Sequence, residues 1–151
     1  DVSVEIKDKD DNMKFMLADL SVIRQIPDMK NTTDWNASLE ITKEFTNKFI
    51  KAKNALPESE NFGIKCSGDE AEVIINYSTI NNNRITFHEK ITNGKDMNVI
   101  CFSSTLLKEI LQANKDYKHG ELSVSEAGLA KVTFTLPNGT STYYLVQLQT
   151  S

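Results

Sequence analysis

The sequence has no hydrophobic run long enough to cross a membrane, and it lacks the charged start and apolar stretch of a signal peptide. A membrane-spanning helix needs about 20 consecutive apolar residues. We therefore expect a soluble chain that works inside the cell. With 151 residues, 39% of them hydrophobic and 25% charged, it is long enough for one well-buried core and short for two independent domains.

The sequence also has few residues arranged for catalysis or metal binding. Cys66 and Cys101 lie in strand-like runs without CxxC spacing, and we interpret both as reduced core thiols. His88 and His119 lack partners at metal-ligand spacing. There is no GxSxG, no HExxH and no glycine-rich phosphate loop. We predict a protein that is not an enzyme and that binds no metal or cofactor.

An acidic cluster near the start of the chain comprises Asp8, Asp10, Asp11 and Asn12. It lacks the glycine and the distal glutamate of an EF-hand loop, so we interpret it as a solvated turn. The turn separates an alternating run at residues 2–6 from an apolar run at residues 13–26, which predicts a hairpin.

The strongest feature that is present is an internal repeat with a period of about sixty residues. Residues 42–50 and 103–111 both have the pattern of a helix, each after a strand-like run and each before a hairpin that turns at Gly68 or Gly128. The matched pairs are Thr42 with Ser103, Phe45 with Leu106, Phe49 with Ile110, Ile50 with Leu111, and Ala52 with Ala113. We predict an α+β fold of duplicated β-α-β-β units, with antiparallel sheets and two helices on one face.

Each predicted helix has an apolar stripe and a polar face. The buried stripes are expected to contain Phe45, Phe49, Ala52 and Leu56 on the first helix and Leu106, Leu107, Ile110 and Leu111 on the second. The exposed faces are expected to contain Lys43, Asn47, Lys51 and Asn54 on the first and Thr105, Lys108, Gln112 and Lys115 on the second. No polar residue interrupts the stripes, which disfavours a small-ligand cavity between helices and sheet.

Positive charge is concentrated on the two helical segments of an acidic chain. Their seven lysines and three acids give +4, whereas the whole chain carries −4, so the other residues sum to −8. The lysines are Lys43, Lys48, Lys51, Lys53, Lys108, Lys115 and Lys118, and the acids are Glu44, Glu109 and Asp116. Such faces are either ordinary solvated helix surfaces or one surface prepared for phosphate.

The order of elements in the last third resembles a DNA sliding clamp. It runs through Met97-Asn98-Val99-Ile100-Cys101-Phe102-Ser103-Ser104, a helix at 105–114, a strand pair at 121–136 and a closing strand at 141–148. The Tyr143-Tyr144-Leu145 ending is similar to the closing strand of the eukaryotic clamp PCNA. The closer resemblance, over essentially the whole chain, is to the clamps of myovirus-type bacteriophages. Residues 1–26 resemble the last hairpin of an N-terminally truncated first domain, residues 27–34 an interdomain linker, and residues 35–151 a complete second domain.

The resemblance implies a ring of three subunits whose helices face duplex DNA without reading its sequence. It implies that the clamp tethers the replicative DNA polymerase, is placed by an ATP-dependent clamp loader, and works in the cytoplasm of an infected bacterial host. The DNA-facing residues would be Lys43, Asn47, Lys48, Lys51, Lys53, Lys108, Gln112 and Lys115. A pocket for client peptides would involve Ile26, Pro27, Met29, Trp35, Tyr144, Leu145 and Val146. We expect the chain by itself not to close a ring, and a virion structural or adaptor module is the alternative function.

Overall fold

The computed structural model describes residues 3–8, 11–16, 34–80 and 82–149, and the chain divides into two compact units, Asp1–Thr32 and Thr33–Ser151. In the first unit, β1 (Ser3–Asp8) and β2 (Asp11–Met16) form an antiparallel hairpin. The predicted hairpin is therefore present in the described residues. Its assignment to a first clamp domain stays a prediction.

The second unit contains the predicted duplication, and each copy has one strand more than expected. The first copy is β3 (Ala37–Glu40), α1 (Lys43–Ala55), β4 (Asn61–Ser67), β5 (Glu70–Ile75) and β6 (Ile85–Gly94). The second copy is β7 (Met97–Ser103), α2 (Ser104–Ala113), β8 (His119–Ser125), β9 (Leu129–Leu136) and β10 (Gly139–Val146). No helix in the described part of the chain is long and apolar enough to span a membrane.

Local chemistry explains why corresponding elements begin and turn at corresponding places. The side chains of Thr42 and Ser103 cap α1 and α2, accepting hydrogen bonds from the backbone N–H groups of Phe45 (3.0 Å) and Leu106 (3.2 Å). The β4–β5 turn has φ +62° at Gly68, and the β8–β9 turn has φ +88° at the equivalent glycine. These backbone angles favour residues without a Cβ atom.

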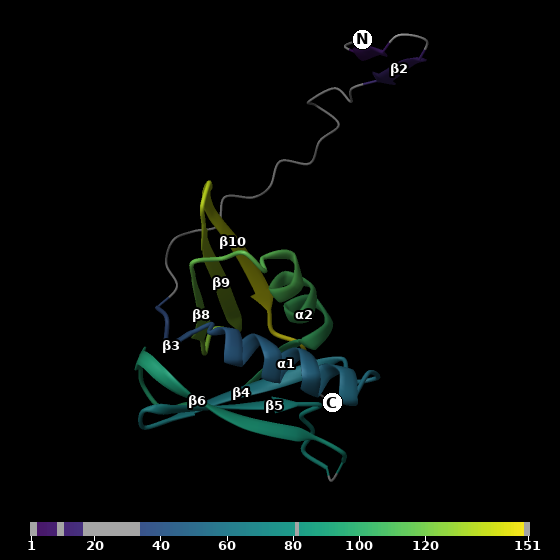
Figure 1. The fold of residues 1–151 in the computed structure, drawn as a ribbon. Coiled ribbons are helices and arrows are strands. Elements are labelled where there is room, and N and C mark those ends of the chain that lie inside the picture. The colour runs from purple at the N-terminus through teal and green to yellow at the C-terminus, as the bar shows by residue number, and fades with distance from the viewer. Residues whose placement is uncertain (1–2, 9–10, 17–33, 81, 150–151) are drawn as a thin grey trace. The chain divides into compact units, whose positions relative to one another are not determined.

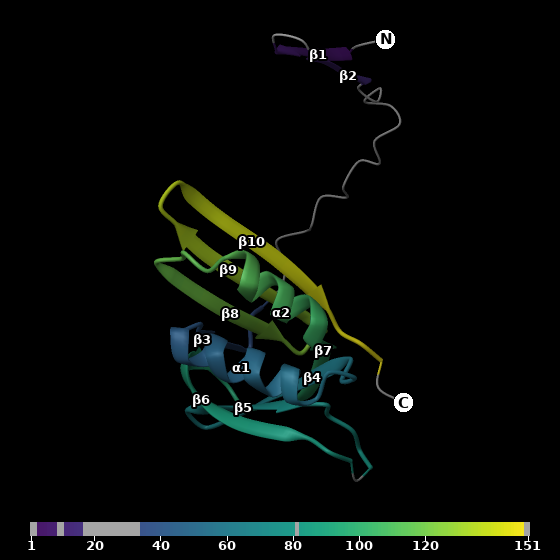
Figure 2. The ribbon, with the colours of Figure 1, turned by 45° about the vertical axis from the view of Figure 1, so that its right-hand side comes forward.

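The eight strands form one antiparallel sheet in the order β10-β9-β8-β3-β6-β5-β4-β7. The first strand of each copy pairs with the second strand of the other, as β3 with β8 and β7 with β4. The backbone N–H of Leu148 donates to the carbonyl of Cys101 at 2.9 Å, so the chain that follows β10 reaches the edge strand β7. The sheet therefore curls around the two helices (Figures 1 and 2).

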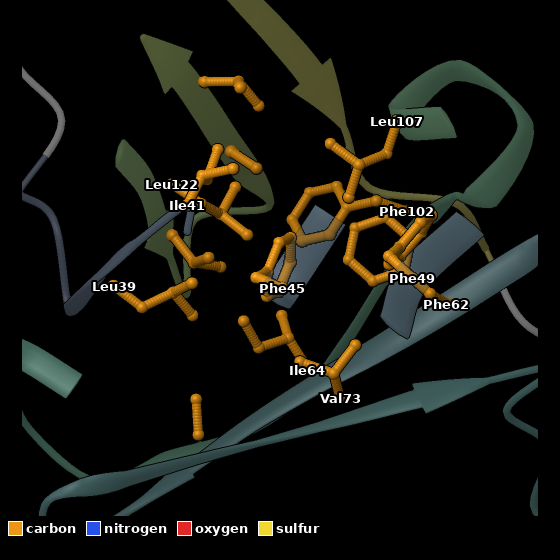
Figure 3. Packing of buried hydrophobic residues seen from close by; sticks show 14 of the residues in the cluster. Leu39, Ile41, Phe45, Phe49, Phe62, Ile64, Val73, Phe102, Leu107 and Leu122 are labelled. Carbon is orange, nitrogen blue, oxygen red and sulfur yellow. The ribbon is translucent and has the colours of Figure 1, made fainter. Parts of the chain in front are cut away.

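The core lies between the helices and the inner face of this sheet (Figure 3). Phe45 and Phe49 of α1 are fully buried, and the Phe49 ring packs edge-on against Phe62 with centroids 5.2 Å apart. The prediction of an α+β fold with both helices on one face of antiparallel strands is confirmed. Cys66 and Cys101 are buried free thiols, and burial raises the pKa of each to about 11.

The buried stripe of α2 differs from the predicted one. Leu107 and Leu111 are 0% and 1% exposed, whereas Leu106 is 50% exposed. Counted from the capping residues, the buried positions of α2 lie one residue later than those of α1, a rotation of about 100° around the helix axis. The core counterparts of Phe45 and Phe49 are therefore Leu107 and Leu111, and the prediction that Leu106 is buried was wrong.

Candidate nucleic-acid interface

The two helices lie side by side and run in opposite directions (Figure 2). At one end, Lys43 Nζ donates to the carbonyl of Lys115 at 2.6 Å and lies 4.3 Å from the centre of the Tyr117 ring. At the other end, Lys108 Nζ donates to Asn54 Oδ1 at 2.7 Å. Lysines at both ends of the helix pair are thus held along its surface.

Six of the eight predicted DNA-facing residues occupy the polar sides of this helix pair. We call them the helix surface: Lys43, Asn47, Lys51, Lys108, Gln112 and Lys115. All are exposed except Lys108, which is partly buried. The exposed acids Glu109 and Asp116 also lie on or just after α2. The four lysines outnumber these two acids, so the helix surface can attract a polyanion.

A second group of predicted residues meets on the opposite, outer face of the sheet. Tyr144 of β10 pairs with Lys131 of β9, and Lys131 Nζ lies 4.9 Å from the centre of the Trp35 ring. Val146 pairs with Leu129 on the same two strands. Tyr144 and Val146 are 44% and 72% exposed. We call these five residues the outer-face patch.

No protein-family model and no curated protein sequence matches the chain. Its structure resembles a PCNA2–PCNA3 complex from Sulfolobus tokodaii (TM-score 0.65, 13% identity) and the Proliferating Cellular Nuclear Antigen of Entamoeba histolytica (0.64, 17%). These matches cover 96% and 99% of this chain. The beta subunit of DNA polymerase III from Thermotoga maritima matches 84% of this chain and 35% of its own at 13% identity (TM-score 0.62). The chain has the sliding-clamp fold. It spans 59% and 60% of the two PCNA chains.

Two of the predicted DNA-facing lysines have polar partners elsewhere in the domain. Lys53 is 6% exposed, and its Nζ donates to the carbonyl of Pro57 at 2.6 Å. It lies four residues after Phe49, so it falls beside the buried stripe and not opposite to it. Lys48 Nζ lies 2.9 Å from Glu44 and 3.5 Å from Glu89, and its hydrogen bond to Glu44 is the main reason that its pKa is raised. Its charge is offset by two carboxylates.

The residues predicted for the client pocket that the structure describes also divide into two sets. Leu145 is 3% exposed and faces the core, since it alternates along β10 with the outward Tyr144 and Val146. Leu145 therefore cannot contact a client directly, which corrects the prediction, whereas Trp35, Tyr144 and Val146 lie on the outer face. Ile26, Pro27 and Met29 are outside the described residues.

Sequence reasoning missed Lys131, which lies between Trp35 and Tyr144. Its signal was the alternation of β9, where Ala130, Val132 and Phe134 are buried and Lys131 points the other way. Within the described ranges, no group of three or more His, Cys, Asp or Glu side chains could hold a metal ion. His119 Nδ1 instead lies 3.9 Å from the exposed Glu40 carboxylate.

Proposed function

We propose that this chain is a domain of a sliding clamp that encloses duplex DNA and holds the replicative DNA polymerase on its template. The observation that supports this function best is the helix surface, which gathers lysines on one side of a sliding-clamp fold, whereas the residues outside the helical segments carry a net charge of −8. The role requires no bond to be made or broken, in keeping with the prediction that the protein is not an enzyme.

The helix surface is suited to sliding contacts with phosphate. Lysine carries a compact, hydrated point charge on a flexible stem, and contacts to the DNA backbone carry no base sequence. Lys43 and Lys108 donate hydrogen bonds to groups on the helix pair, so their ammonium groups lie close to the helices and leave room for a duplex to slide past. The net charge of −8 outside the helical segments opposes DNA binding elsewhere on the protein.

We propose the assembly and the partners on the strength of the fold and the sequence resemblance. The assembly is a homotrimer, and an ATP-dependent loader places it on DNA. The source is a myovirus-type bacteriophage, and the location is the cytoplasm of its host. The outer-face patch is the surface that receives a hydrophobic segment of the polymerase, because it presents aromatic and aliphatic side chains next to one another.

Charge reversal on the helix surface tests the DNA-binding role. We compare Lys43→Glu/Lys51→Glu/Lys108→Glu with a matched control, Lys65→Glu/Lys90→Glu/Lys95→Glu, whose exposed lysines lie on or next to the strands of the sheet. Binding to a labelled duplex is measured by fluorescence anisotropy at several salt concentrations. Each lysine that contacts a phosphate contributes about 0.9 to the slope of log affinity against log salt, so the first variant should lose up to about 2.7.

The control has the same net charge as the test variant and should retain the parental slope. An equal loss of binding in both variants would mean that total charge, and not the helix surface, governs the affinity. An unchanged slope in a folded test variant would remove the helix surface from DNA binding and contradict the proposed function.

A further inference from the structure

Lys131 lies in a row of cross-strand neighbours that crosses the outer face of the sheet. Its partner on β10 is Tyr144, its partner on β8 is Ser123, and Ser123 pairs in turn with Ser38 of β3. The hydroxyl oxygens of Ser38 and Ser123 are 2.8 Å apart, so they satisfy each other. Lys131 is therefore the charged member of an otherwise neutral row.

The ammonium group of Lys131 has an aromatic contact and no acidic one in the part of the chain that the structure describes. The Trp35 ring lies 4.9 Å away, whereas no carboxylate of the described residues lies within ion-pair distance. One of the two adjacent rows on this face carries Glu121, whose carboxylate accepts a hydrogen bond from Ser123 at 3.3 Å. Lys131 is thus a cation among the apolar side chains of the patch, and Glu121 is an acid on one side of it.

We propose that Lys131 makes the outer-face patch selective for client segments that carry a carboxylate, from Asp, Glu or a chain end, between their apolar anchors. This inference rests on the proposed function, because it names the chemistry of the segment that the patch receives. Trp35, Tyr144 and Val146 contact the apolar anchors, and Lys131 pairs with the acid.

Two physical reasons favour a carboxylate at this place. The contact with Trp35 already restricts the Lys131 side chain, so less conformational entropy is lost when an ion pair forms. Apolar anchors that cover Tyr144 and Val146 also exclude water from the pair and weaken its screening. Glu121 repels an acid placed one row away, which favours a carboxylate beside Lys131 over one in that row.

Selection from a random library of twelve-residue peptides tests the proposal, because such a library includes acidic and neutral segments alike. Peptides are selected on the full chain, and those that fail to bind Tyr144→Ser are retained as specific for the patch. Their binding is then measured by the fluorescence of Trp35, which is the only tryptophan of the protein and lies in the patch. Each peptide is compared with its Asp→Asn or Glu→Gln counterpart.

Patch-specific peptides should be enriched in acidic residues, and removing the acid should weaken binding about fivefold, the upper range for a partly exposed ion pair. The same change should have no effect on Lys131→Met, which keeps the apolar stem, and should keep its full effect on the control Lys90→Met. Patch-specific peptides without acid enrichment, or an acid effect that persists in Lys131→Met, would overturn the role of Lys131 and leave the patch as a client surface. If no peptide depends on Tyr144, both the patch and this inference fail, and the salt dependence of duplex binding still decides the DNA-binding role separately.

Discussion

Lys53 and Lys51 offer a direct test of how α1 is oriented, because they are two residues apart and have opposite environments. Lys53 is buried and bonded to Pro57, whereas Lys51 is exposed on the helix surface. We predict that Lys53→Ala lowers stability without affecting DNA binding. Lys51→Ala should do the reverse.

The expected magnitude for Lys53→Ala follows from three contributions. The lost charged hydrogen bond contributes about 1.5 kcal/mol, at the low end of its range because Pro57 is exposed and water can replace the donor. Three buried methylene groups contribute about 0.8 kcal/mol each. The freed side-chain entropy returns up to about 2 kcal/mol. The net destabilisation should therefore be about 2 kcal/mol, whereas Lys51→Ala should change stability by no more than about 0.5 kcal/mol.

Urea denaturation and salt-dependent duplex binding measure the two effects separately. With a denaturant dependence of about 2 kcal/mol per molar urea, the midpoint of Lys53→Ala should fall by about 1 M. Its salt slope should stay parental, whereas Lys51→Ala should lose about 0.9 from that slope. If Lys53→Ala keeps its midpoint and loses slope as Lys51→Ala does, Lys53 faces DNA after all, and the last turn of α1 is not oriented with Lys53 toward the core.

Three further predictions concern β10, the helix caps and the thiols. Leu145→Ala should cost about 2–5 kcal/mol of stability because it empties a core position, whereas Val146→Ala should leave stability within about 0.5 kcal/mol and weaken peptide binding; thermal melts and Trp35 fluorescence titrations separate the two. Thr42→Ala and Ser103→Ala should each cost about 1 kcal/mol in urea denaturation, since each removes the acceptor for an N–H group in the first turn, and a neutral result for either would dismiss that cap. Because burial raises the pKa of Cys66 and Cys101 from 9.0 to about 11, the folded chain keeps protons that the unfolded chain releases, so stability should fall as the pH rises from 9 to 11. Urea midpoints across this pH range should fall less steeply in Cys66→Ala/Cys101→Ala than in the parent protein. An equal fall in the two proteins would contradict the raised pKa of these thiols.

The duplicated fold was predictable because its local signals agree. Thr42 and Ser103 begin helices at matching places, and Gly68 and Gly128 turn matching hairpins. Strand alternation and helix periodicity then leave few arrangements for the elements between them. The pairing of each first strand with the other copy was not predictable, since no local pattern encodes which distant strand becomes a neighbour.

The misplaced residues share a different cause, which is local ambiguity. Leu106 and Leu107 are both apolar, and only packing against the sheet decides which of them is buried. Tyr144, Leu145 and Val146 form an apolar run without visible alternation, so the sequence does not reveal that the middle one points inward. Lys53 combines an apolar stem with a charged tip, and its burial depends on a carbonyl four residues away.

The exchange of first strands between the copies has a consequence for how such a duplication can arise and fold. β3 pairs on one side with β6 of its own copy and on the other side with β8, and β7 pairs with β4, so each first strand takes a neighbour from the other copy. A single ancestral copy would have needed a second molecule to supply the missing neighbour, as in a strand-swapped dimer. When two copies are fused, the strands pair within one chain. The entropic cost is then that of closing a loop, which does not depend on protein concentration. The two copies of this domain therefore pair as the subunits of such a dimer would, and we expect them to unfold together.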